Sequence, residues 1–198
     1  KYTVLAGDEA FGLYAISDAV KYYSSALDLA RRLRDSAYNS HIYPRLGRAL
    51  LLNSEYDRGL ELYTRMQDEA EASGNKVMLL EALLALATLH AEPSELWDDD
   101  LARSLCRQAL ELAQELGDRA AEARIYWILT LTEVRSSHEQ QSIEYSKKAL
   151  ALAEELGLME LKALVLNDVS QAYGFIERLD LWKSSLDEAR SILRELGR

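Results

Sequence analysis

The residue types that most often carry catalysis or bind metals are few in this chain and lie far apart. The three histidines, His41, His90 and His138, fall in separate stretches with no paired spacing that would indicate a metal site. Cys106 stands where the repeats described below place a large side chain, so we expect it to pack in the core rather than act as a nucleophile. We therefore expect no enzyme activity, no metal and no cofactor.

Two other motifs could in principle bind ions or nucleotides. Gly-Asp at 7–8 and at 117–118 lacks the neighbouring glycines and the Lys-Ser/Thr of a phosphate-binding loop. The acidic segment 92–100 ends in three successive Asp residues, which we interpret as the cap of a helix that begins near Leu101. The alternative is a Ca²⁺ or partner site, although the segment lacks the alternating oxygen ligands and distal Glu of an EF-hand loop. We expect Trp97 to cover the end of a helical hairpin.

Charge and composition narrow the range of partners. Acidic side chains outnumber basic ones by 33 to 23, for a net charge of −10, which opposes binding to nucleic acid or to an anionic membrane surface. A single cysteine cannot form an internal disulfide and suits a reducing compartment. Because the sequence shows no signal peptide and no apolar run near 18 residues, we expect a soluble, cytoplasmic protein.

The elements that must position any site follow an internal repeat. Small residues recur in register at Gly7, Gly47, Ala87, Thr130 and Ser170, spaced by 40, 40, 43 and 40 positions. Two further series keep step with them, at Ala19, Gly59, Ala102, Ser142 and Trp182, and at Ala26, Met66, Ala109, Ala149 and Ala189. A period in this range predicts stacked supersecondary units. We expect one repeat domain over residues 1–198, as part of a longer chain.

Each unit is expected to be a pair of helices. Apolar residues recur at helical spacing almost throughout, and no segment reads as a strand. Glycines stand where helices should end, at Gly74, Gly117, Gly157 and Gly197. The predicted helices cover residues 3–15 and 17–34, 37–53 and 55–73, 76–91 and 98–116, 119–135 and 139–156, and 159–176 and 179–196. The fold class is therefore all-α.

The repeats resemble the tetratricopeptide repeat (TPR), whose pattern is W-x2-L-G-x2-Y, A-x3-F and a late proline. The second repeat matches best, with Leu46-Gly47 followed by Tyr56, Gly59 and Tyr63. The late proline is missing throughout, and the period is about 40 instead of the usual ~34. The resemblance implies a right-handed α-solenoid of about five TPR-like hairpins with longer helices.

The long repeats, such as 108–118 and 148–157, also resemble the helical arrays of bacterial signal-transduction NTPases. That group includes transcription factors of the maltose-regulon activator type and regulators linked to nucleotide cyclases. The resemblance implies a sensor or docking arm in signal transduction or transcription regulation, with the NTPase and output domains outside this chain.

The candidate binding surface follows from the geometry of such an array. Residues at offsets −6, −3, +1 and +4 from each small crossing residue lie on one face of the first helix of each pair, toward the concave side. The partner-binding residues predicted in this way are His41, Arg48, Glu81, Leu84, Thr88, Arg124, Trp127, Asn167 and Gln171. We expect Arg48, Arg124 and Trp127 to contribute most. An ordinary solvated groove would show the same mixture of residues.

Two functions remain open at this point. One is a scaffold or docking domain that binds a protein, a peptide or other domains of its own polypeptide. The other is a small-molecule or peptide sensor whose ligand lies in the concave groove. Residues 182–196 carry apolar side chains that a further repeat would cover, so a homodimer through this C-terminal edge is also expected. His90 and Glu133 occupy equivalent positions and could share a buried hydrogen bond.

Overall fold

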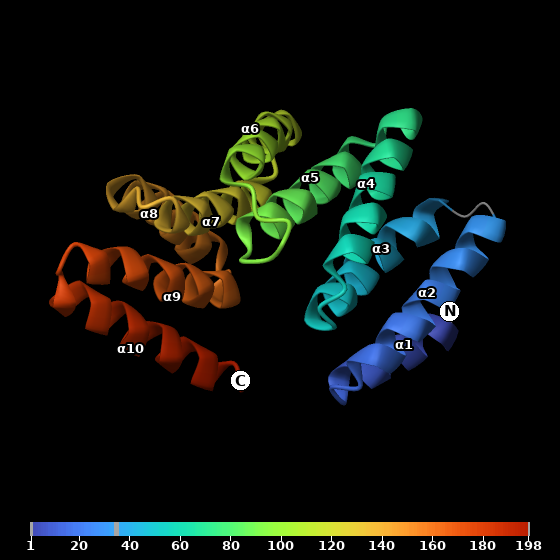
Figure 1. The fold of residues 1–198 in the computed structure, drawn as a ribbon, viewed down its shortest axis with the longest axis horizontal. Coiled ribbons are helices and arrows are strands. Elements are labelled where there is room, and N and C mark those ends of the chain that lie inside the picture. The colour runs from blue at the N-terminus through green and yellow to red at the C-terminus, as the bar shows by residue number, and fades with distance from the viewer. Residues whose placement is uncertain (1, 34–35, 198) are drawn as a thin grey trace. The chain divides into compact units, whose positions relative to one another are not determined.

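The computed structural model describes residues 2–33 and 36–197, with side chains for all of these except 36–40. Ten α-helices and no strand occur in this part of the chain (Figure 1). The helices are α1 (Tyr2–Gly12), α2 (Ile16–Arg32), α3 (Ser36–Leu52), α4 (Tyr56–Ser73), α5 (Lys76–Ala91), α6 (Asp99–Leu116), α7 (Arg119–Arg135), α8 (Glu139–Leu156), α9 (Met159–Phe175) and α10 (Leu179–Glu195). The all-α fold is confirmed, and every predicted helix end lies within three residues of the observed one.

The helices form two compact units. Unit 1 comprises the residues up to Leu89 together with Ser94–Leu96, and unit 2 comprises His90–Pro93 and the residues from Trp97 onward. Unit 1 holds α1 to α4 and most of α5, and unit 2 holds α6 to α10. The prediction of one domain over 1–198 stays a prediction.

Small residues stand where the two helices of a hairpin approach closely. A Cβ atom built on Gly7 would lie 2.5 Å from the ring of Tyr23, and one on Gly47 would strike the ring of Tyr63. In repeat three the position of these tyrosines is taken by Cys106, which is fully buried. Burial raises the pKa of its thiol to about 12, so the side chain stays protonated and packs as a small apolar group. The predicted core role of Cys106 is confirmed.

Left-handed residues form the turns between helices. Gly74, Gly117 and Gly157 have φ of 64°, 68° and 68° and follow α4, α6 and α8, as the sequence predicted. The short turns after α1, α3, α7 and α9 also place one residue at positive φ, and none of these four residues is glycine. These residues are Tyr14, Ser54, Ser137 and Glu177, with φ of 58° to 60°.

The acidic segment 92–100 includes the connection between α5 and α6, which is longer than the other turns. The Asp98 carboxylate accepts a hydrogen bond from the backbone N–H of Leu101 at 2.9 Å, so the predicted helix cap is confirmed. Trp97 donates its indole N–H to Asp99 at 2.8 Å and leaves about half of its surface exposed.

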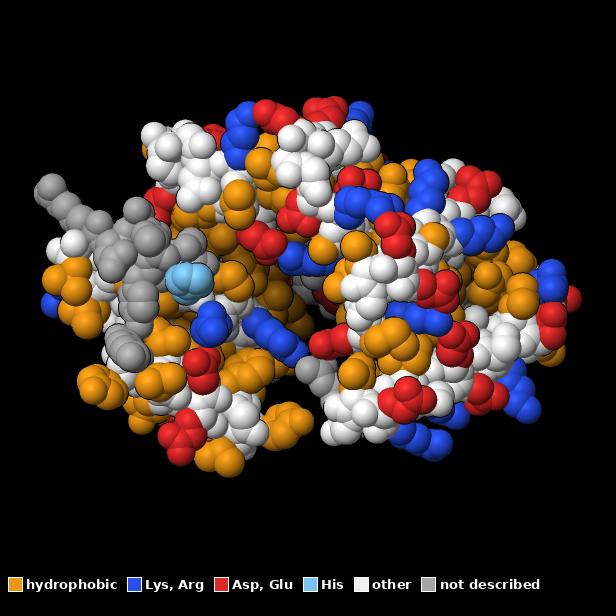
Figure 2. Space-filling model, turned by 180° about the vertical axis from the view of Figure 1, so that it is seen from behind, with side chains coloured by type: hydrophobic (Ala, Val, Ile, Leu, Met, Phe, Trp, Pro, Cys, Tyr) orange, Lys and Arg blue, Asp and Glu red, His pale blue; other side chains and the backbone are white. Residues whose placement is uncertain are grey.

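The surface shows no broad region of one charge on the face seen in Figure 2, where acidic, basic and apolar side chains are interspersed. None of the helices in the described part of the chain combines the length and the apolar composition needed to cross a bilayer. At the C-terminal edge, Trp182 and Leu196 are exposed, whereas Ile192 is buried in a cluster with Leu166 and Ala189. The expected apolar edge is therefore narrower than the sequence indicated.

Candidate partner-binding site

Unit 2 contains an apolar pocket of about 610 Å³, which we call the α7–α9 pocket. Helices α7 and α9 contact each other (Figure 1), and Leu196, the residue after α10, belongs to the lining of the pocket. The lining residues are Ala120, Arg124, Trp127, Gly157, Leu158, Met159, Glu160, Leu161, Leu164 and Leu196. Arg124 and Glu160 are the only charged residues among them, so the pocket is an apolar surface with two charges.

Local sequence explains how these side chains converge. Ala120, Arg124 and Trp127 follow one another at helical spacing and so share one face of α7, whose first turn is capped by Asp118. Gly157 ends α8 in the left-handed conformation, and the reversed chain then places Leu158 at the cap of α9.

Trp127 is fixed by a hydrogen bond beside the pocket. Its indole N–H donates to Asp168 Oδ2 at 2.8 Å, and the side-chain amide of Asn167 donates to Asp168 Oδ1 at 3.0 Å. Burial raises the pKa of the Asp168 carboxyl, and the two hydrogen bonds oppose that shift. Because Asp168 on α9 holds the indole ring through this hydrogen bond, the ring of Trp127 is already positioned before any partner binds.

The structure brings together part of the predicted surface in unit 2. Arg124 and Trp127, two of the predicted partner-binding residues, line the α7–α9 pocket. Asn167 and Gln171 are exposed on α9, outside the lining, and Asn167 supports Trp127 through Asp168.

In unit 1 the predicted residues are spread along α3 and α5. His41 is exposed, and Arg48 lies over the ring of Phe11, with 5.4 Å from its guanidinium carbon to the ring centroid. Glu81 and Thr88 are partly buried, and the Thr88 hydroxyl donates to the carbonyl of its own helix four residues earlier, at 2.8 Å.

Leu84 requires a correction. Its side chain is fully buried, so it cannot contact a partner at the surface. The reason lies in α5, which is apolar nearly all round and therefore buries a wider face than the offset rule assumes.

Sequence reasoning missed the residues that the turn between α8 and α9 contributes. Leu158 and Met159 follow directly on Gly157, and Leu196 lies at the end of α10. The signal was available in the Leu-Gly-Leu-Met stretch 156–159, because apolar residues directly after a helix-ending glycine have no polar reason to be there. The offset rule considered only the middle of each first helix.

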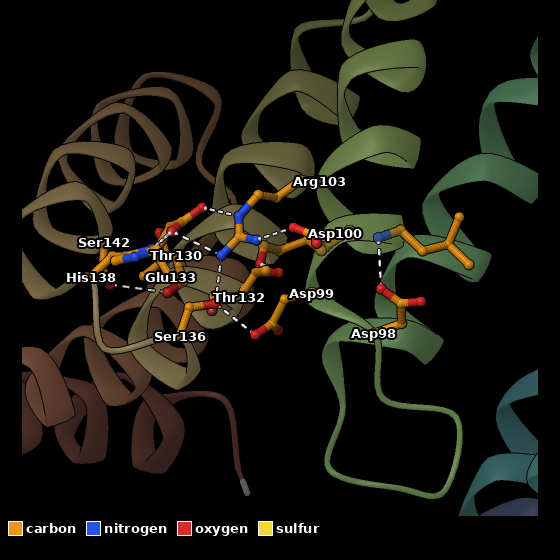
Figure 3. A network of polar contacts seen from close by, with 12 residues as sticks. Asp98, Asp99, Asp100, Arg103, Thr130, Thr132, Glu133, Ser136, His138 and Ser142 are labelled. Atoms are coloured by element: carbon orange, nitrogen blue, oxygen red, sulfur yellow. Dashed lines mark hydrogen bonds and ion pairs between the residues drawn. The ribbon is translucent and has the colours of Figure 1, made fainter.

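A second polar cluster in unit 2 surrounds Glu133, whose side chain is 6% exposed (Figure 3). Arg103 donates from Nε to Oε1 at 2.8 Å and from Nη2 to Oε2 at 3.3 Å, and His138 Nδ1 lies 2.8 Å from Oε2. The sequence singled out Glu133 but paired it with His90, whereas the contacts shown for its carboxylate are with Arg103 and His138. Over the described ranges, no three His, Cys, Asp or Glu side chains gather where they could hold a metal ion.

Comparison with known proteins identifies the fold of this chain but assigns it to no family. No protein-family model and no curated protein matches the sequence. Among solved structures, BtubC (BKLC) from P. vanneervenii is 18% identical, with 91% of this chain and 74% of that chain covered at a TM-score of 0.72. RapI in its apo form is 13% identical, with 99% and 83% covered at a TM-score of 0.72. At these identities the likeness shows the fold alone, an all-α helical-repeat fold of the TPR-like kind.

Proposed function

We propose that this chain is a protein-interaction module that binds a segment of a partner protein in the α7–α9 pocket. The observation that supports the proposal best is the pocket itself. Its apolar lining contains Arg124 and the indole ring of Trp127, which is held by a hydrogen bond to Asp168. Buried aromatic and arginine side chains often dominate the energy of protein interfaces. The module has no catalytic role in this proposal.

The lining favours one kind of occupant. Met159, Leu164 and Leu196 are each more than a third exposed, so the apolar surface lies open to solvent. An apolar side chain of a partner segment would bury this surface and its own together. A polar small molecule, as in the sensor alternative, needs several converging polar groups, and the lining offers two charged side chains. We therefore favour an apolar anchor residue within a protein or peptide.

The wider role rests on the resemblance to regulator arrays. We propose a cytoplasmic bacterial regulator in which this module docks a partner or another domain of the same polypeptide. Signal transduction or transcription regulation would then be carried out by domains outside this chain, with nucleic acid contacted elsewhere.

A displayed random-peptide library selected on the full chain tests the site. We expect the selected peptides to share one or two apolar anchor residues and to shift amide resonances of α7 and α9 in NMR spectra. Trp127→Ala and Leu164→Asp should each weaken binding by about tenfold or more, or about 1.4 kcal/mol. Lys147→Ala, an exposed change on α8, is the matched control and should leave the affinity unchanged. Peptides that bind both pocket variants as tightly as the wild type would place the site elsewhere, and selection of small polar ligands alone would favour the sensor.

A further inference from the structure

A second pocket of unit 2, of about 400 Å³, differs from the first in its charge. We call it the α6–α8 pocket because it is lined by α6, α7 and α8. Its lining residues are Arg103, Cys106, Arg107, Leu110, Tyr126, Leu129, Glu133, Tyr145 and Lys148. Three of these are cations and one is an acid, in a chain whose net charge is −10.

The single acid of the lining is already balanced. Glu133 receives two hydrogen bonds from the guanidinium of Arg103, which also donates from Nη1 to Asp100 at 2.9 Å (Figure 3). Arg103 is therefore held as part of the pocket wall. The remaining cations, Arg107 and Lys148, add two positive charges that no acidic residue of the lining offsets.

Aromatic rings hold one of these cations in place. The rings of Tyr126 and Tyr145 are stacked, with centroids 6.2 Å apart. Lys148 Nζ lies 5.2 Å from the centroid of Tyr126 and 5.6 Å from that of Tyr145. A cation over two rings is attracted by the negative faces of both, which positions it. Leu110 and Leu129 supply an apolar interior next to it.

Unit 1 provides an internal comparison, because an equivalent pocket of about 210 Å³ lies between α2, α3 and α4. Its residues stand 83 positions earlier, so that Leu27, Leu46 and Arg65 correspond to Leu110, Leu129 and Lys148. Asp28 and Glu61 line the unit 1 pocket and reduce its charge.

Each lining holds three cations, but that of unit 2 holds one acid where that of unit 1 holds two, and it also contains two tyrosine rings. The residues corresponding to Asp28 and Glu61 are Glu111 and Glu144, which are exposed and outside the lining. Ser24 and Leu62 of unit 1 are replaced by Arg107 and Tyr145. The repeat therefore offers an equivalent pocket twice, and the lining in unit 2 carries two excess positive charges against one in unit 1.

We propose that the α6–α8 pocket binds an organic anion, with an apolar body against Leu110, Leu129 and Tyr126 and a carboxylate or phosphate group between Arg107 and Lys148. Cations of this kind form charge-assisted hydrogen bonds with such groups. The apolar body distinguishes this ligand from a simple ion. The proposal concerns a separate pocket and does not depend on the α7–α9 pocket.

Titration of the full chain, followed by NMR amide shifts of α6, α7 and α8, tests the chemistry. The probes are phenyl phosphate and benzoate, with benzyl alcohol as the neutral analogue and inorganic phosphate as the anion without a body. We expect saturable binding of the two aromatic anions, weaker at higher salt, and at least about tenfold weaker binding of both controls. A short peptide ending in a Phe carboxylate distinguishes the source: tighter binding than benzoate indicates a peptide ligand, and equal or weaker binding indicates a small molecule.

Variants locate the site. Arg107→Gln and Lys148→Gln should each weaken phenyl phosphate binding by about tenfold, and Arg65→Gln in the unit 1 pocket should leave it unchanged. Absence of saturable shifts would overturn the proposal. Equal binding of benzyl alcohol or of inorganic phosphate, or unaltered affinity of the Arg107→Gln/Lys148→Gln double variant, would do so as well.

Discussion

Glu133 is an acidic residue whose side chain is buried inside unit 2. A carboxylate in the interior is tolerated only when it is paired and its oxygens accept hydrogen bonds. Both oxygens of Glu133 do so, from Arg103 on the preceding helix and from His138 at the start of α8. Arg103 continues the chain of contacts to the Ser136 hydroxyl at 2.5 Å, and that hydroxyl donates to Asp99 at 2.6 Å. The Glu133 side chain on α7 therefore connects the beginning of α6, through Arg103, with the beginning of α8, through His138.

Replacement of Glu133 by alanine should destabilise the fold. Arg103, whose side chain is 26% exposed, would lose its main partner, so we expect a loss of about 1–3 kcal/mol in the free energy of unfolding, measured with urea. Asp100→Ala removes the other acidic partner of Arg103, but its side chain is 98% exposed, and the loss should stay below about 0.5 kcal/mol. Equal losses in the two variants would contradict the role given to burial.

Asp168 should make stability depend on pH in the direction opposite to that of a salt-bridged acid. Burial raises its pKa in the folded state above the value of an unfolded Asp, so the folded state binds the proton more tightly. Its contribution to stability is therefore greatest below the unfolded pKa and is lost as the pH rises through the folded pKa. We expect Asp168→Asn, which can still accept from Trp127, to gain stability relative to the wild type as the pH rises above about 4, the pKa of an unfolded Asp. Urea unfolding at several pH values measures this, and a difference that does not change with pH would contradict it.

Among the structural elements, the turns that use glycine can be predicted from the sequence, whereas the other turns cannot. Glycines 74, 117 and 157 end the second helix of a hairpin, and glycine after a helical stripe is a recognisable stop signal. The turns inside hairpins use the same left-handed geometry at Tyr14, Ser54, Ser137 and Glu177. In each, the next residue donates its N–H to a carbonyl five positions back, for example Glu55 to Leu50 at 2.9 Å. Tyr, Ser and Glu give no local signal of this conformation, because these residue types rarely adopt positive φ.

These turns predict where stability can be gained. A residue other than glycine at positive φ carries a steric cost of about 1–2 kcal/mol, which is partly offset because glycine loses more entropy on folding. Ser54 and Glu177 are exposed, so Ser54→Gly and Glu177→Gly should each stabilise the fold by about 0.5–1 kcal/mol. Gly157→Ala makes the reverse change and should destabilise it by about 1 kcal/mol. Thermal and urea unfolding measure all three, and a loss of stability in both glycine variants would contradict the argument.

At the scale of the whole molecule, the periodicity of the sequence predicts the fold. It predicts only some of the residues that line the α7–α9 pocket. Because a repeat is built from equivalent stacked units, the small residues 40 or 43 positions apart, the apolar spacing and the helix-ending glycines together place the ten helices of the described residues. The same geometry selects Arg124 and Trp127, which line the α7–α9 pocket, and their part in partner binding stays a prediction. It failed at Leu84, where an apolar helix buries more than one face, and it could not find Leu158 or Leu196, which approach the pocket from a turn and from another helix.

The final prediction concerns contact between copies of the chain. Phe175, Leu179, Trp182 and Leu196 lie on or next to the ends of α9 and α10, and each is at least 42% exposed. Large exposed apolar side chains tend to find a partner surface, and we expect two copies to associate through this edge. The net charge of −10 opposes association, and its repulsion is screened over about 30 Å at 0.01 M salt but over about 8 Å at 0.15 M.

Dimerisation, measured by sedimentation velocity, should therefore strengthen as salt is added, the reverse of an interface held by ion pairs. Leu179→Gln with Trp182→Gln should abolish it without changing the charge. Leu13→Gln, at an exposed leucine of unit 1, is the matched control and should leave it intact. A monomer at both salt concentrations, or a dimer that the double variant preserves, would show that this edge is not the contact surface.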